Sequence, residues 1–146
     1  MIRRVFDEES ANICDNLLTK LILDERQYDS SIDSDFRVKE WFKNKIKDND
    51  NILLCYEEDN IIKGYIFLKL ILNDDSKEYL IDGLYVEEDF RRQGIASKLI
   101  KEALDIVKES DINFVNINVL ANNLSAISLY KSFGFDEFKI SMRKEI

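Results

Sequence analysis

Apolar residues recur along this chain with two periods, one typical of helices and one of strands. The helical period predicts four helices, at residues 10–26, 36–46, 95–108 and 123–133, the second of them capped by Asp33 or Ser34. Alternating or continuous apolar runs predict six strands, at residues 2–6, 51–57, 61–72, 78–86, 113–120 and 135–146. This order predicts one α/β layered domain over residues 1–146.

One junction between a predicted strand and a predicted helix has the composition of an anion-binding site. The strand at 81–86 runs into a short charged loop, and a helix begins near residue 95. The first backbone N–H groups of a helix lack intrahelical partners, and the helix dipole favours negative charge there. Gly94 and Ala96 keep the approach to the backbone open, and cations gather nearby at Arg91, Arg92 and Lys98. The junction therefore predicts a pyrophosphate-like ligand, although a basic helix start without a ligand fits the same residues.

The common nucleotide-binding loops do not fit this junction. A Walker loop requires a Gly-Lys dipeptide, which the chain lacks. A dinucleotide fingerprint requires two glycines two positions apart, and none of the four glycines is so placed. By contrast, Arg91-x-x-Gly94-x-Ala96 resembles the pyrophosphate loop of GNAT-type N-acetyltransferases, which bind acetyl-CoA.

A second motif supports the same resemblance. The segment from Asn123 to Phe135 is similar to the Asn-x-x-Ala-Ile-x-Leu-Tyr-x-x-x-Gly-Phe signature of that family. It follows the first motif after one predicted helix and one predicted strand, as in the family. The resemblance covers residues 50–146 well and the N-terminal third by pattern only.

The resemblance implies the GNAT acyl-CoA N-acyltransferase fold, a central mixed sheet flanked by helices. The strands at 78–86 and 113–120 are expected to splay apart and leave a slot for the pantetheine arm. The residues that the resemblance places against acetyl-CoA are Leu84, Tyr85, Val86, Arg91, Arg92, Gln93, Gly94, Ile95, Ala96, Ser97, Asn123 and Tyr130. Gln93 and Ala96 stand where many relatives carry glycine.

The implied reaction is direct attack of a primary amine on the acetyl thioester. An alkyl amine is neutral only about one part in several thousand at neutral pH, so a base or a water is needed. Asp82 is the expected base and Glu78 a second candidate, and both are expected to face the same side as Leu84 and Val86. A solvated strand carboxylate is the competing interpretation of Asp82. Asn118 stands where some relatives carry a glutamate base, and an amide cannot take that role.

Two further groups complete the implied mechanism. The resemblance assigns the N–H of Leu84 or Val86 as the donor to the developing oxyanion. It assigns Tyr130 as the general acid that protonates the leaving thiolate, and packing against Phe133 and Phe135 is the alternative role for this side chain. Asn123 would contact the cofactor and would also make a good helix cap.

Composition limits the kinds of partner that the chain is expected to bind. The 146 residues carry a net charge of −8, which disfavours nucleic acid and suits a cationic acceptor, although an acidic surface also serves solubility. The chain has no histidine, so an imidazole base and an ordinary zinc site are excluded, and no metal is expected. No apolar run is long enough to span a bilayer, and the N-terminus lacks the apolar stretch of a signal peptide. We therefore expect no membrane partner. Two isolated cysteines, Cys14 and Cys55, are expected to be reduced core residues of a cytoplasmic protein.

These observations leave three functions open. The first is an N-acetyltransferase acting on a small-molecule or peptide amine; the second is a catalytically silent acyl-CoA sensor; the third is an interaction protein without a ligand. The connection between the first two predicted helices is acidic and is expected to lie near the acceptor. Its carboxylates favour a cationic acceptor and are Asp24, Glu25, Asp29, Asp33 and Asp35. The chain after Gly134-Phe135 is long enough for one strand, so the acceptor pocket is either open or completed by a second subunit, and we expect a homodimer.

Overall fold

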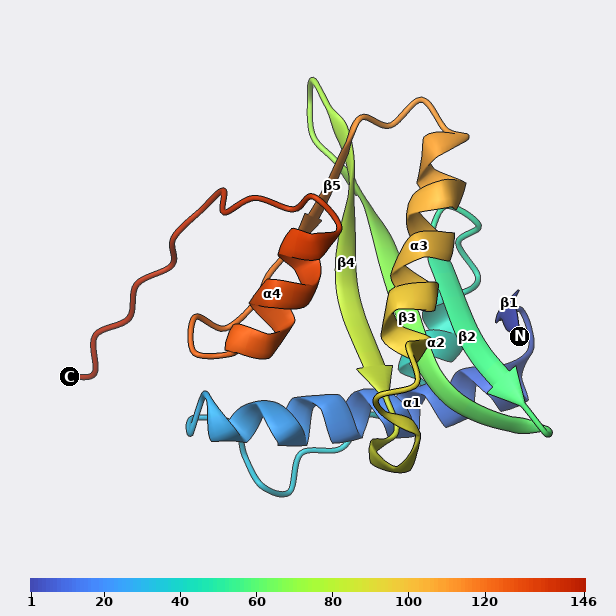
Figure 1. Cartoon of the computed structure of the whole chain (residues 1–146), viewed down its shortest axis with the longest axis horizontal. Helices are drawn as coiled ribbons and strands as arrows, with labels where there is room; N and C mark the ends of the chain where they lie inside the picture. The colour runs from blue at the N-terminus through green and yellow to red at the C-terminus, as the bar shows by residue number, and fades with distance from the viewer.

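The computed structural model describes all 146 residues and has one five-stranded sheet in the order β1-β2-β3-β4-β5, with helices on both faces (Figure 1). The strands are β1 (Ile2–Arg4), β2 (Ile52–Glu58), β3 (Ile61–Leu72), β4 (Lys77–Val86) and β5 (Phe114–Ile117). The helices are α1 (Glu8–Asp24), η1 (Glu25–Gln27), α2 (Trp41–Lys45), η2 (Glu88–Phe90), α3 (Ile95–Lys108) and α4 (Leu124–Ser132). No helix has both the length and the apolar character needed to cross a bilayer.

The sheet is mixed, as the resemblance implies. β1 to β4 pair antiparallel, and β4 pairs parallel with β5. The β2–β3 hairpin closes through Asp59 and Asn60, whose φ angles of 55° and 61° are those of a two-residue turn that matches strand twist. This turn fixes the register of the β2–β3 ladder.

Each face of the sheet has its own apolar cluster. α3 packs on one face, where Leu99, Ile100 and Ala103 are fully buried against β2, β3 and β4. α1 and α2 cover part of the other face, where Phe42 packs edge-on against the rings of Tyr65 and Phe67. The molecule therefore has a helix-sheet-helix arrangement, and the edge of the sheet at β5 lies beside α4 (Figure 1).

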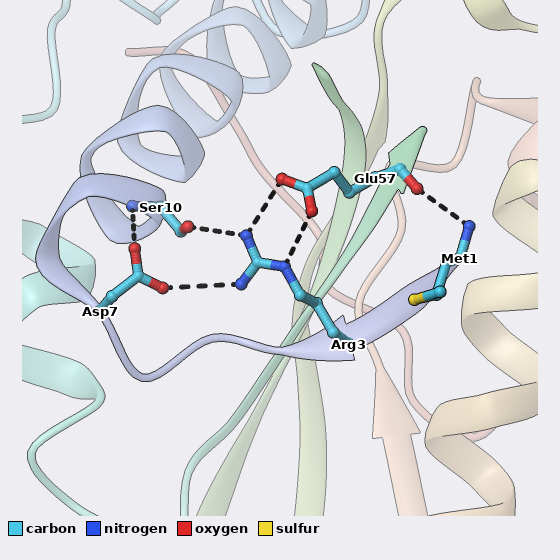
Figure 2. A network of polar contacts seen from close by, with 5 residues as sticks. All are labelled: Met1, Arg3, Asp7, Ser10 and Glu57. Atoms are coloured by element: carbon cyan, nitrogen blue, oxygen red, sulfur yellow. Dashed lines mark hydrogen bonds and ion pairs between the residues drawn. The ribbon is translucent and has the colours of Figure 1, made fainter. Parts of the chain in front are cut away.

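A polar network holds the N-terminal strand, β1, in place (Figure 2). The Arg3 guanidinium donates to both oxygens of Glu57 at 3.2 Å and to the Ser10 hydroxyl at 2.9 Å. The Asp7 carboxylate caps α1 by accepting the Ser10 N–H at 2.9 Å, and the Met1 ammonium donates to the Glu57 carbonyl. These contacts join β1, β2 and the start of α1.

The second helix is shorter than predicted and begins later. The Asp33 carboxylate accepts the Asp35 N–H at 2.9 Å, so it closes a local turn instead of capping a helix. α2 begins at Trp41 after Glu40, which has a φ of 55°. Its first turn is held by the buried carboxylate of Asp15, which accepts the Phe42 N–H at 3.0 Å. A long-range contact thus sets this boundary, and local pattern does not show it.

The predicted final strand at 135–146 is wrong. α4 ends at Ser132, Gly134 takes a φ of 91°, and the Phe135 N–H donates to the Tyr130 carbonyl at 3.2 Å. Beyond this cap the chain has no regular structure and runs away from the sheet (Figure 1). Alternating apolar residues favour a strand, but a strand forms only where a neighbouring edge supplies hydrogen bonds.

Candidate functional site

β4 and β5 separate halfway along β4. Their parallel pairing covers only Glu78–Ile81 on β4 and Phe114–Ile117 on β5. From Asp82 to Val86, β4 is paired with β3 alone. The expected splay of the two central strands is therefore confirmed, with β5 shorter than the predicted 113–120.

A β-bulge marks the point of separation. In the β3–β4 ladder Phe67 lies opposite Gly83 and Leu68 lies opposite Ile81, so Asp82 is the extra residue. A bulge shifts the alternation of side chains and increases local twist. Both effects help to turn the second half of β4 away from β5.

The bulge also overturns one expectation about side-chain direction. Ile81 before the bulge and Val86 after it both lie in the α3 cluster, although five positions separate them. Asp82 and Glu78 therefore do not share a face with Leu84 and Val86; they lie on the face that carries α1 and α2. The simple count of even spacings fails because the strand contains one extra residue.

The two candidate carboxylates have different surroundings. Partial desolvation raises the pKa of Asp82, and the charges of Lys69 and Lys45 oppose that shift. Glu78 accepts a hydrogen bond of 2.7 Å from the Asn116 side chain across the β4–β5 pairing. Glu78 and Asp82 lie four positions apart along the strand, about 13 Å. Only Asp82 lies where the strands separate.

A buried tyrosine hydroxyl points at the bulge. Tyr65 is fully buried, and its hydroxyl has no hydrogen-bond partner. A Cβ atom at Gly83 would lie 2.6 Å from that oxygen, so the position admits only glycine while Tyr65 keeps this rotamer. Burial raises the pKa of Tyr65 well above its ordinary value, and the hydroxyl stays protonated.

Backbone donors line the open edge of β4. The Glu87 N–H donates to the Lys63 carbonyl of β3 at 2.8 Å. Because direction alternates along an antiparallel strand, Tyr85 also faces β3, while Leu84 and Val86 direct their N–H groups toward the opening. The side chain of Tyr85 is buried in the cluster under α1, so it does not line the opening.

The loop after β4 presents a row of free donors. None of the backbone N–H groups from Arg92 to Ser97 donates a hydrogen bond within the chain. Arg92 and Gly94 adopt φ angles of 65° and 77°, and no atom lies within 4 Å of where a Gly94 Cβ would be. Gly94 caps α3 without a side chain, so the helix N-terminus is open to an anion. The geometry fits a pyrophosphate group.

Arg91 makes contacts within the chain that the sequence did not predict. Its Nε donates to the Val86 carbonyl at 2.9 Å, and its terminal nitrogen lies 3.2 Å from the Asp24 carboxylate. The guanidinium carbon lies 5.1 Å from the centre of the Tyr85 ring. Arg91 thus joins the loop to the C-terminal end of α1, and both Arg91 and Arg92 remain exposed beside the free donors.

α4 brings the second motif to the site. The Asn123 side chain accepts the Ala126 N–H at 3.2 Å, which confirms its expected role as a helix cap. Tyr130 is half-buried against the α3 cluster, with its ring 6.2 Å from that of Phe135. Burial raises the pKa of the Tyr130 hydroxyl, and the Glu25 charge raises it further.

Glu25 belongs to the acidic segment that was expected near the acceptor, but the sequence did not reveal that its carboxylate is partly buried. It begins η1, just beyond α1, whose C-terminal end lies below α4 in Figure 1. Burial raises its pKa, the neighbouring Asp29 charge adds to the effect, and no hydrogen bond or ion pair engages its carboxylate. Its charge raises the pKa of both Tyr65 and Tyr130. The acidic composition of 24–35 was visible in the sequence, but the burial of this carboxylate depends on packing.

Comparison with known proteins gives the same family as the motifs. The model of the acetyltransferase (GNAT) family matches residues 16–135. An uncharacterized N-acetyltransferase from Methanocaldococcus jannaschii is 30% identical over 113 residues, which are 72% of this chain and 50% of that protein. The [ribosomal protein bS18]-alanine N-acetyltransferase of Escherichia coli is 32% identical over 63 residues, or 43% of each chain. The chain spans about half the length of the curated relatives it matches.

A solved structure agrees with the whole fold. A predicted acetyltransferase from Clostridium acetobutylicum, solved with acetyl-CoA, superposes with a TM-score of 0.79 at 18% identity, over 99% of this chain and 96% of that one. At this identity the likeness concerns the fold. Taken with the family match over residues 16–135, it shows that this chain belongs to the GNAT acetyltransferase family.

Proposed function

We propose that this chain is an acetyl-CoA-dependent N-acetyltransferase that acts on a primary amine. The observation that carries the proposal is the continuity of two sets of free donors. The N–H groups of Leu84 and Val86 face the opening beside β4, and the row from Arg92 to Ser97 follows at the end of the same strand. An extended ligand with a carbonyl at one end and a pyrophosphate at the other suits this spacing.

Acetyl-CoA, when bound, supplies the activated acetyl thioester. The donors from Arg92 to Ser97 would hold its pyrophosphate, with the exposed Arg92 and Lys98 side chains adding positive charge. The N–H of Leu84 or Val86 would stabilise negative charge on the thioester oxygen, because a fixed donor needs no reorganisation during the reaction. Asn123, whose side chain caps α4, would also contact the cofactor.

Proton transfer is assigned to side chains on the two sides of the opening. Tyr130 is the proposed acid for the leaving thiolate, and its raised pKa keeps the hydroxyl protonated at neutral pH. Asp82, directly or through a water, is the proposed base, and desolvation raises its pKa toward the range useful in catalysis. Glu78 is kept as a second candidate on the same face, although Asn116 already engages its carboxylate.

The acceptor is proposed to be a cationic amine, small or peptidic. Glu25 and Asp29 bring negative charge to the Tyr130 side of the site, and the chain as a whole carries −8. Peptide N-termini belong among the candidates because the Escherichia coli relative is named for the alanine of ribosomal protein bS18. We place the protein in the cytoplasm, because Cys14 and Cys55 are free, buried thiols, whose pKa values burial raises.

The test is thiol release from acetyl-CoA by purified protein against polyamines, aminoglycosides, amino acids and N-terminal peptides. Release above the acceptor-free background with one class would establish the activity and its substrate class. Binding of acetyl-CoA with silence across the panel would favour the alternative, an acyl-CoA sensor.

The Tyr130→Phe variant tests the proposed acid. Turnover should fall by about two to four orders of magnitude, the range of general acid catalysis, while the Kd for acetyl-CoA stays near that of the wild type. Unchanged turnover would remove Tyr130 from the mechanism.

A further inference from the structure

The C-terminal tail, residues 135–146, places a cation on the acidic segment after α1. The tail leaves α4 and runs outward on the side of the molecule where α1 ends (Figure 1). Arg143 donates to the Asp29 carboxylate at 2.9 Å. The Arg143 side chain is 73% exposed, whereas that of Asp29 is only 16% exposed. A guanidinium of the chain itself therefore occupies a carboxylate on the proposed acceptor side of the site.

The Asp29 carboxylate is held in place by its own turn. Ser31 donates to Asp29 Oδ1 from its backbone N–H at 3.1 Å and from its hydroxyl at 2.6 Å. The Ser31 hydroxyl is the main cause of the lowered pKa of Asp29, and Arg143 adds to it, so the carboxylate is ionised at neutral pH. The Arg143 donor also goes to Oδ1, and no hydrogen bond or ion pair engages Oδ2. A fixed, ionised carboxylate of this kind binds cationic donors well.

Asp29 lies one helical turn beyond Glu25. The Asp29 N–H donates to the Glu25 carbonyl at 2.9 Å, and residues so related have Cβ atoms about 5–6 Å apart. The Asp29 charge raises the pKa of Glu25, and the Glu25 charge in turn raises the pKa of the Tyr130 hydroxyl. The two carboxylates thus lead from the place where the tail binds to the proposed acid.

Tyr65 is an independent sign that a polar group of a ligand reaches this region. Its hydroxyl is fully buried and has no partner, although buried hydroxyls are normally hydrogen-bonded. The charges of Asp82 and Glu25 both raise its pKa, so both carboxylates lie within electrostatic range of it. An amine at the β4 bulge would supply the missing donor, since a phenol oxygen accepts hydrogen bonds.

The hold of the tail on Asp29 is weak enough to be reversed. Two ion pairs anchor the tail, that of Glu137 with Lys131 at 3.0 Å and that of Arg143 with Asp29. Three large apolar side chains of the tail are at least 80% exposed and contribute no buried contact: Phe138, Ile140 and Met142. Ion pairs of exposed side chains contribute little stability, so a cation from solution can replace Arg143.

We propose that Asp29 is a specificity-determining residue that binds a second cation of the acceptor, and that Arg143 takes this place until the acceptor displaces it. The inference rests on the proposed acetyltransferase function and narrows the acceptor to an amine that carries a second ammonium or guanidinium group. The reacting amine lies at Asp82 and Tyr130, and the second cation lies on Asp29. The tail competes with the acceptor and lowers its apparent affinity by a small factor.

Thiol release from acetyl-CoA tests the proposal with diamines from diaminopropane to diaminooctane, each against the monoamine of equal length. The diamine of fitting length should have a KM about tenfold lower than its monoamine. Asp29→Asn should remove this preference through KM, because the amide lacks the charge. Since the amide oxygen still accepts from Ser31, circular dichroism should not change. A tripeptide with a free N-terminus and a second-position arginine, against its glutamine analogue, shows whether a peptide carries the second cation.

Variants of the tail test the competition. Arg143→Gln should lower the KM for the fitting diamine by about two- to sixfold, because the competing cation is gone. Lys144→Gln is the matched control, since it removes the same charge from the next residue, which makes no ion pair, and it should leave this KM unchanged. In the Asp29→Asn background, Arg143→Gln should have no further effect.

The outcomes separate this proposal from the acetyltransferase function on which it rests. Thiol release without a preference for any dication, or with a preference that Asp29→Asn leaves intact, would overturn the role of Asp29 and uphold the acetyltransferase. Silence with every amine would count against the acetyltransferase, and calorimetry with the same diamines would then decide the role of Asp29. Binding that Asp29→Asn weakens about tenfold supports that role, and equal binding to both proteins contradicts it.

Discussion

The two halves of β4 are made of similar residues but have different neighbours. Lys77–Ile81 pairs with β3 on one side and β5 on the other, and its buried residues join the α3 cluster. Asp82–Val86 keeps β3 and loses β5, so two of its N–H groups face an opening. One extra residue, Asp82, separates a strand half that stabilises the sheet from a half that is available to a ligand.

Gly83 and Gly94 show the same division between a structural role and a ligand-binding role. Gly83 is required by close packing, since Tyr65 fills the space where a side chain would be. Gly94 is required by backbone conformation, since its φ is 77° and its surroundings are empty. Substitutions at Gly83 should act on stability alone, whereas substitutions at Gly94 should also weaken ligand binding.

Gly94→Asp should produce the largest effect on binding. A carboxylate at the start of α3 repels a pyrophosphate and covers the free donors, so the Kd for acetyl-CoA should rise at least about a hundredfold. Gly134→Asp is the matched control, because Gly134 has a φ of 91° with no atom within 4 Å of its missing Cβ. Both variants should lose similar stability, and calorimetry should find the binding defect in Gly94→Asp alone. Equal affinities would contradict the assignment of this loop.

Gly83→Ala should produce the largest effect on stability. The added methyl group would meet the Tyr65 hydroxyl at 2.6 Å, and forcing the ring aside should cost about 2 kcal/mol. Urea unfolding measures the loss. In a Tyr65→Phe background the cost should shrink, and a purely additive double mutant would show that the two positions are not coupled.

Tyr65→Phe alone should stabilise the protein modestly. Its buried hydroxyl has no partner, and removing such a group recovers desolvation free energy of about 1 kcal/mol. The midpoint of urea unfolding should therefore rise with an unchanged m-value. A destabilised Tyr65→Phe variant would indicate that a buried water satisfies the hydroxyl.

Glu25→Gln should have the smallest effect, visible as a change in pH dependence. Burial raises the pKa of Glu25 above 4.5, so the folded state binds its proton more tightly than the unfolded state does. Stability is therefore lost as pH rises from the unfolded to the folded pKa. The variant should lose less stability over that interval than the wild type. Identical pH profiles would show that Glu25 is solvated.

The regular elements of the fold were predictable because local patterns determine them. The helix at 95–108 was predicted with both of its bounds, since Gly94 precedes an amphipathic run. The β2–β3 hairpin followed from Asp59-Asn60 between two apolar segments. The two motifs also located the loop after β4 and the start of α4.

The parts that the sequence misjudged depend on distant contacts. The bulge at Asp82 accompanies the packing of Tyr65 on Gly83, so counting positions along β4 gave the wrong face for the carboxylates. The contact of the Arg91 guanidinium with Asp24, 67 residues away in the sequence, was likewise not predictable from local pattern. The tail shows that alternation specifies a strand face without specifying its partner.

The central claim is that acetyl-CoA occupies the open edge of β4 and the loop that follows. Titration of ¹⁵N-labelled protein with acetyl-CoA, followed by amide chemical shifts, tests it most directly. The account predicts that the largest shifts fall on Leu84, Val86 and the amides from Arg92 to Ser97, with small shifts on Lys77–Ile81. Largest shifts around Asp74 and Phe114, which line a hollow at the start of β5, with the Arg92–Ser97 amides unmoved, would contradict it.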